Sequence, residues 1–103
     1  MKIALGADHA GFEVKQALLI HITEMGHQVQ DMGTNSSDAC DYPLIGEQVA
    51  KAVSSHQADR GILVCGNGIG MSIVANKVPG VRAALVFTEK MAQDTRTHND
   101  SNV

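Results

Sequence analysis

The chain has 103 residues and a formal net charge of −3; 44% of its residues are apolar, but only 3% are aromatic. This length fits one domain, residues 1–103, with a modest core of small and medium apolar side chains. The basic residues are scattered and form no patch for nucleic acid. The N-terminus lacks the apolar run of a signal peptide, and no stretch is long enough to span a membrane. We therefore expect a cytoplasmic protein with neither nucleic acid nor membrane as a partner.

The first half of the chain alternates strand and helix patterns. A short apolar run over 2–6 predicts a buried strand, and helical spacing of apolar residues predicts a helix over 12–25. Alternation over 27–31 predicts a second strand. After a polar loop, a helix is expected over 43–54, with proline in its favoured first turn. The apolar stripe expected on the first helix comprises Val14, Ala17, Leu18, His21, Ile22 and Met25.

The second half repeats this alternation. The apolar run over 60–65 predicts a third strand, buried on both faces. A helix is predicted over 69–76 and a fourth strand over 81–87. Thr88 is expected to cap a last helix through about residue 97, which His98-Asn99-Asp100 breaks. Strands that alternate with helices imply a parallel sheet with right-handed crossovers, arranged as a Rossmann-like three-layer α/β/α sandwich.

Residues 100–103 have the pattern of the approach to a further strand, at which the sequence stops. A sheet edge left open there would be a liability for aggregation. We therefore expect that the native chain continues beyond Val103 and that the C-terminal portion of the fold is missing here.

Ligands of open parallel sheets bind beyond the carboxyl ends of the strands. Three unusual segments follow predicted strands or their loops: 7–11, 41–43 and 65–70. The segment 98–100 lies beyond the last helix, and topology alone does not place it. The first three segments are therefore the candidate site.

The run Gly66-Asn67-Gly68-Ile69-Gly70 leads from a strand into a helix. Successive backbone N–H groups in such a turn can bind a phosphate or an oxyanion that develops during a reaction. The alternative is a tight turn that needs glycine only for its geometry. The run is neither a P-loop nor a complete dinucleotide fingerprint.

Cys65 is the candidate nucleophile or base, because it directly precedes those N–H groups. Backbone donors and a helix N-terminus favour a thiolate, but cysteine is also a common small core residue, and position alone favours neither interpretation. Asp8 and His9 could each act as a general acid or base, or Asp8 could cap the following helix. His98 is a further candidate. Cys40 lies in a polar loop, and both cysteines are expected to be reduced.

Together these motifs resemble the type B ribose-5-phosphate isomerases, in the wider group that includes galactose-6-phosphate isomerase subunits. The matching stretches are residues 2–12, 41–43, 61–72, 75–77 and 98–103. They cover nearly the whole chain, and several separate motifs in the right order make the resemblance specific.

The resemblance implies reversible aldose–ketose isomerisation of a five-carbon sugar phosphate, between ribose 5-phosphate and ribulose 5-phosphate, without a metal or other cofactor. Cys65 matches the base that forms a cis-enediolate, and His98 aided by Asp8 matches the ring-opening acid/base pair. The implied substrate contacts are His9 to the phosphate, Tyr42, Asn99 and the loop residues Gly66, Asn67, Gly68, Ile69 and Gly70. Family sites form between two subunits, so a homodimer or homotetramer is implied.

This chain departs from the family pattern at Asn67, where the family commonly has Thr or Ser. The family also carries phosphate-binding arginines beyond the position of Val103. The presence of both Cys65 and His98 favours a self-sufficient ribose-type enzyme over a divided galactose-type subunit, while allose 6-phosphate stays open as a substrate. A non-catalytic phosphate- or nucleotide-binding module is the alternative from another class.

Overall fold

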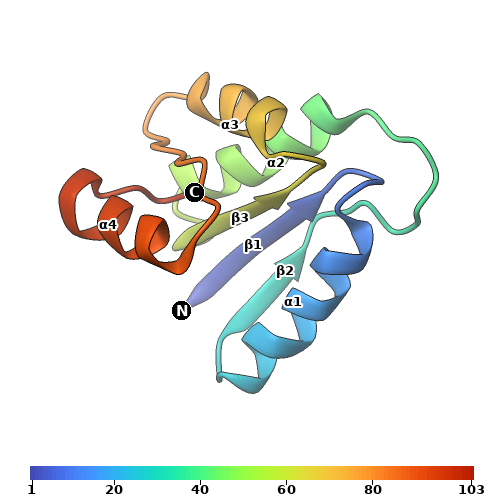
Figure 1. Ribbon diagram of the computed structural model, residues 1–103, viewed down its shortest axis with the longest axis horizontal. Coiled ribbons are helices and arrows are strands. Elements are labelled where there is room, and N and C mark those ends of the chain that lie inside the picture. Colours follow the sequence, from blue (N-terminus) through green and yellow to red (C-terminus); the bar gives the residue numbers. More distant parts are fainter.

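The computed structural model describes residues 1–103 as a parallel sheet with helices on both faces (Figure 1). In chain order the elements are β1 (Lys2–Ala7), α1 (Phe12–Glu24), β2 (Gln28–Asp31), α2 (Tyr42–Ser54), β3 (Arg60–Val64), α3 (Ile69–Asn76) and α4 (Glu89–Asn99). The predicted α/β class is confirmed, and each predicted element up to α3 agrees to within one residue at either end. None of the helices is both long and apolar enough to cross a bilayer.

The order of the strands decides where the layers and the site lie. The sheet order is β2-β1-β3, with all pairs parallel. The connection from β1 to β2 and the one from β2 to β3 therefore run in opposite directions. Right-handed crossovers place α1 and α2 on opposite faces of the sheet for this reason, and α3 packs beside α2. The direction changes between β1 and β3, so their carboxyl ends form the crevice where ligands bind in such sheets.

The face that α1 turns to the sheet differs from the predicted stripe. Of that stripe, Ile22 is buried, whereas Val14 and Met25 are 53% and 60% exposed. Lys15 is fully buried instead, and its Nζ lies 2.7 Å from Asp31 Oδ2. The helical period allows either face to turn inward. The carboxylate at the end of β2 offers the buried ammonium a partner, which the apolar pattern alone did not reveal.

The predicted strand over 81–87 is wrong, because this segment joins no ladder of the sheet. Two side-chain amides hold its beginning. Asn76 accepts from the Ala83 N–H and donates to the Ala83 carbonyl, each at 2.9 Å. Asn102 accepts from the Arg82 N–H at 2.8 Å. The residues beside β3 on that side are Asn102 and Val103, and β3 is half-buried rather than buried on both faces.

The last helix begins as predicted and ends later. Thr88 Oγ1 accepts a hydrogen bond from the Met91 N–H at 3.1 Å, which confirms the predicted cap. His98 and Asn99 are helical, so the helix runs two residues further than predicted; the break comes at Asp100, the last residue of the predicted segment, which has a φ of 51°. No residue of α4 is buried, and α4 packs against no other helix or strand of the chain.

Candidate active site

A cleft of about 380 Å³ lies at the carboxyl ends of β1 and β3. The residues that line it are Asp8, Tyr42, Cys65, Gly66, Asn67 and Gly70. They come from the residue after β1, the start of α2, the loop between β3 and α3, and the first turn of α3. The structure thus brings together three of the predicted segments, because parallel strands carry their following loops to one edge of the sheet.

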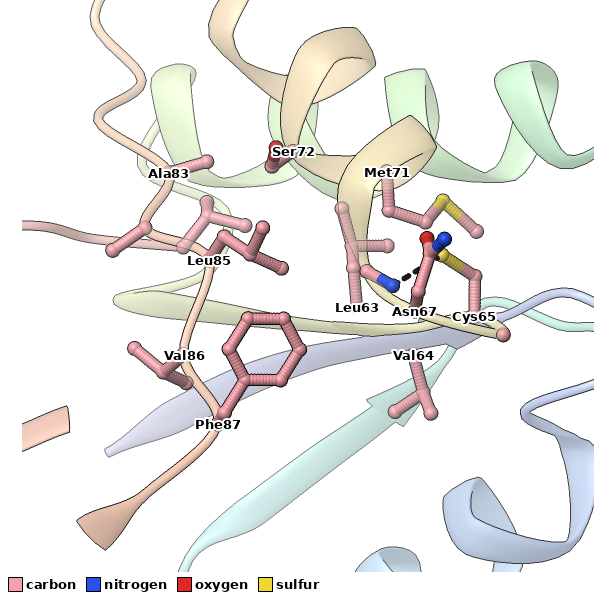
Figure 2. A pocket seen from close by; sticks show the side chains of 14 residues that line it. Leu63, Val64, Cys65, Asn67, Met71, Ser72, Ala83, Leu85, Val86 and Phe87 are labelled. Carbon is pink, nitrogen blue, oxygen red and sulfur yellow. Dashed lines mark hydrogen bonds between the residues drawn. The ribbon is translucent and has the colours of Figure 1, made fainter. Parts of the chain in front are cut away.

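Cys65 is the cysteine that lines this cleft. Its thiol is free and half-buried. The sulfur Sγ accepts a hydrogen bond from the Gly68 N–H at 3.1 Å, drawn as a dashed line in Figure 2. This bond fixes the sulfur at the start of the glycine loop, and a cysteine takes up a proton or attacks an electrophile in its thiolate form. The sequence analysis did not predict this hydrogen bond from the Gly68 N–H to the thiol. The spacing of three residues between Cys65 and Gly68 could have indicated it.

The N–H groups of the glycine loop divide into two sets. The Gly68 N–H serves the thiol, and the Ile69 N–H donates to Asn67 Oδ1 at 3.0 Å. The N–H groups of Gly66, Asn67 and Gly70 donate no hydrogen bond within the chain. These three N–H groups are free to bind an anion or an oxyanion. The Asn67 side chain therefore stabilises the turn of the loop. The family commonly has the hydroxyl of Thr or Ser at this position, and here an amide oxygen takes its place.

Asp8 does not cap α1 with its side chain as the sequence allowed; it holds the turn before the helix. It is buried, and its Oδ1 accepts from the N–H of Gly11, the residue that caps α1, at 2.9 Å. Its own N–H donates to the Val64 carbonyl at 3.1 Å, which ties the end of β1 to the end of β3. Oδ2 has no hydrogen bond and is not sealed from solvent. One oxygen therefore holds the turn while the other is available in the cleft.

Tyr42 forms a wall of the cleft against the glycine loop. A Cβ placed on Gly70 would lie 2.9 Å from Cε2 and from the hydroxyl oxygen of the Tyr42 ring. Glycine at this position therefore lets the aromatic ring lie directly on the loop, where it can contact a bound molecule.

Three predicted site residues lie away from this cleft within the chain. His9 is exposed and does not line it. His98 and Asn99 belong to α4, which lies on the opposite side of the molecule from the carboxyl end of β3 (Figure 1). The carbonyl of Asn99 accepts from Arg82 Nε at 2.8 Å, beside a separate surface hollow. Within one chain, α4 therefore contributes no residue to the lining of the cleft.

Replacing Gly68 by alanine is expected to destabilise the protein more than Gly26→Ala. Both glycines have positive φ, 81° and 93°, so both substitutions carry about 1–2 kcal/mol of left-handed backbone strain. A Cβ at Gly68 would also lie 2.5 Å from Leu85 Cδ1, whereas nothing lies within 4 Å at Gly26. Urea denaturation should show an additional loss of about 1 kcal/mol or more for Gly68→Ala. Equal losses would mean that Leu85 moves aside freely.

Comparison with known proteins agrees with this geometry. The family model described as Ribose/Galactose Isomerase matches residues 3–103. A ribose-5-phosphate isomerase B of Escherichia coli strain K12 is 49% identical over 102 residues, which are 99% of this chain and 68% of that protein. Ribose-5-phosphate isomerase B of Clostridium thermocellum has a TM-score of 0.97 at 47% identity, covering 99% of this chain and 69% of the other. The type B enzyme of Trypanosoma brucei has a TM-score of 0.94 at 48% identity, covering 99% and 70%. The chain therefore belongs to the Ribose/Galactose Isomerase family.

Proposed function

We propose that this protein interconverts ribose 5-phosphate and ribulose 5-phosphate, with Cys65 as the base and without a metal or other cofactor. The observation that carries the proposal is the thiol of Cys65, which receives the Gly68 N–H beside three unpaired N–H groups and the Asp8 carboxyl. The names of the relatives supply the substrate. We place the reaction in the cytoplasm, in the pentose phosphate pathway.

The chemistry requires a base and a site for negative charge. The Cys65 thiolate takes the proton from C2 of the open-chain aldose, and the electrons move onto the carbonyl oxygen to form a cis-enediolate. The free N–H groups of Gly66, Asn67 and Gly70 bind the oxygen that becomes negative; each such donor is typically worth about 3 kcal/mol in the transition state. The proton of the C2 hydroxyl passes to the C1 oxygen, and the thiol returns a proton to C1 while the C2 oxygen becomes the carbonyl of the ketose. Tyr42 bounds the sugar, and the family resemblance assigns the phosphate contact to His9, which lies outside the lining of the cleft.

The family resemblance assigns the opening of the sugar ring to His98, with help from Asp8. Because α4 lies away from the Cys65 cleft of its own chain, we propose that His98 and Asn99 act in the cleft of a second copy. The absence of packing between α4 and the other elements of its own chain supports this arrangement. The active form would then be a homodimer or a homotetramer built from such dimers.

Mixing two inactive variants tests the shared site. We expect Cys65→Ala and His98→Asn each to be inactive alone. After both are unfolded and refolded together, half of the dimers are mixed, and each mixed dimer holds one intact site of two. Activity should return to about a quarter of the unsubstituted value. No recovery, with mixed dimers demonstrated by mass spectrometry, would place Cys65 and His98 in the same chain.

The substrate is tested by an assay of the 103-residue chain with ribose, allose and galactose phosphates. We expect turnover of ribose 5-phosphate at high substrate concentration, with loss of deuterium from C2 and no dependence on added metal. Preferential turnover of a six-carbon phosphate would change the assigned substrate but keep the chemistry. Tight binding of a nucleotide by calorimetry, with no turnover of any sugar phosphate, would replace the isomerase by a binding module.

A further inference from the structure

Lys15 is the most deeply buried charged side chain of the protein, and the proposed mechanism does not use it. Its Nζ donates to both carboxylate oxygens of Asp31, at 2.8 and 2.7 Å, and to Gln16 Oε1 at 3.0 Å. An ammonium has three N–H donors, so the chain itself supplies an acceptor for each of them. The lysine therefore holds the Asp31 carboxylate in one position at the end of β2.

Stability alone does not account for a buried ion pair at this place. Taking two charges out of water can cost as much as their attraction returns, and well-packed apolar residues often stabilise a fold equally well. Apolar side chains cannot, however, accept a hydrogen bond. Asp31 does so, because its Oδ1 also accepts from the Gly33 N–H at 2.9 Å. The lysine thus holds the carboxylate, and the carboxylate holds the loop after β2.

The loop residues that Asp31 holds are bonded in turn to the end of β1. The Gly33 carbonyl accepts from the Ala7 N–H at 2.7 Å, and the Thr34 N–H donates to the Ala7 carbonyl at 2.8 Å. Ala7 is the last residue of β1 and directly precedes Asp8. The ladder between β1 and β2 ends at Asp31, so these two hydrogen bonds extend the hold on β1 to the residue before the cleft.

Asp8 is also held from its other side. Its N–H donates to the Val64 carbonyl at 3.1 Å, and its Oδ1 accepts from the Gly11 N–H at 2.9 Å. The Gly11 carbonyl accepts from the N–H of Lys15 at 2.9 Å. The contacts therefore form a closed ring, which runs from Asp8 through the start of α1 to Lys15 and Asp31, and returns through the loop after β2 to the end of β1.

We propose that Lys15 and Asp31 are positioning residues, which set the carboxyl of Asp8 in the cleft beside Cys65. They touch no substrate and act through the loop after β2 and the end of β1. Without an acceptor at position 31, the Gly33 N–H loses its partner and the end of β1 loosens. The free oxygen of Asp8 then leaves the position from which it helps to open the sugar ring. The kinetic part of this inference rests on the proposed function, whereas the position of Asp8 does not.

Two double variants differ only in whether residue 31 can accept the Gly33 N–H. Both Lys15→Met/Asp31→Asn and Lys15→Met/Asp31→Ala remove the buried charges, so neither leaves an ion without its partner. Asparagine keeps an oxygen in the place of Oδ1, and alanine keeps none.

Amide hydrogen exchange, followed by NMR, is the first measurement. We expect exchange at Ala7 and Asp8 to be about tenfold faster or more in the alanine variant than in the asparagine variant. The reference amide is that of Ala58, a buried residue whose N–H donates to the Ala52 carbonyl at 2.9 Å. It should exchange equally in both variants, which shows that the fold as a whole is intact.

A double-mutant cycle on kcat/KM for ribose 5-phosphate is the second measurement. Both variants are made with Asp8 and with Asp8→Asn, which keeps an acceptor for the Gly11 N–H but removes the carboxylate. With Asp8 present, we expect kcat/KM of the alanine variant to be about tenfold to a hundredfold below that of the asparagine variant. With Asp8→Asn the two values should be equal, because no carboxylate remains to be positioned.

Equal exchange at Ala7 and Asp8 in the two variants would overturn the proposal, whether or not the protein is an isomerase. An activity loss of the same size in the Asp8→Asn background would also overturn it, since the substitutions would then act on the cleft as a whole. Absence of turnover by the unsubstituted protein would refute the proposed function instead. Amide exchange would in that case still decide whether Lys15 and Asp31 position Asp8.

Discussion

Cys65→Ala is expected to lower kcat for ribose 5-phosphate by about two to four orders of magnitude, the usual contribution of a general base. Alanine removes the sulfur that accepts a hydrogen bond from the Gly68 N–H at 3.1 Å. No other group that lines the cleft both accepts this hydrogen bond and lies beside the free N–H groups. Loss of deuterium from C2 of labelled substrate should stop as well. Initial rates and NMR of the labelled sugar measure both effects.

Cys40→Ala is the matched control, because Cys40 is also a free, half-buried cysteine but lies in the loop before α2, outside the cleft. Its activity should equal that of the unsubstituted protein. Cys65→Ser keeps a side chain of similar shape that can still accept the Gly68 N–H, so its expected inactivity separates the chemistry of the base from loop geometry. Continued exchange at C2 in Cys65→Ala would assign the base to another residue.

Asp31→Ala is expected to lower the free energy of unfolding by about 3 kcal/mol, because it leaves a buried ammonium without its carboxylate. The Lys15 side chain is fully buried, and its Nζ donates to both oxygens of Asp31, at 2.8 and 2.7 Å. Asp31 Oδ1 also accepts from the Gly33 N–H at 2.9 Å, so the loop after β2 should loosen too. Chemical denaturation at neutral pH gives the value.

Two comparisons isolate the cause of that loss. Glu47→Ala breaks the exposed pair of Lys51 and Glu47, separated by 2.6 Å, and should cost less than about 1 kcal/mol. The double variant Lys15→Met/Asp31→Ala removes the buried charge as well and should recover much of the stability lost in Asp31→Ala. A double variant as unstable as the single one would show that the contact from Asp31 to Gly33, rather than the ion pair, carries the effect.

Much of the fold could be predicted from local sequence signals. Helix α3 has the predicted bounds, and Thr88 caps α4, because caps, glycines and prolines act through the few residues beside them. The cleft that gathers Asp8, Tyr42 and Cys65 could also be predicted, because the carboxyl ends of parallel strands share one edge.

Other features depended on partners that are distant in the sequence. The apolar pattern of 81–87 is that of a strand, but a strand exists only where a neighbour supplies a ladder, and here Asn76 and Asn102 side chains take that place at its start. The helical period of α1 allowed two faces, and Asp31 selected the one that buries Lys15.

The sequence by itself determined the order of strands and helices as far as α3, the glycine loop with its thiol, and the edge of the sheet where the cleft lies. Only the tertiary structure decided which N–H the thiol receives, which N–H groups stay free, and that α4 carries His98 away from Cys65 of its own chain. The reason is physical: conformational preferences act over a few neighbouring residues, whereas hydrogen-bond partners and distances depend on how separate segments pack.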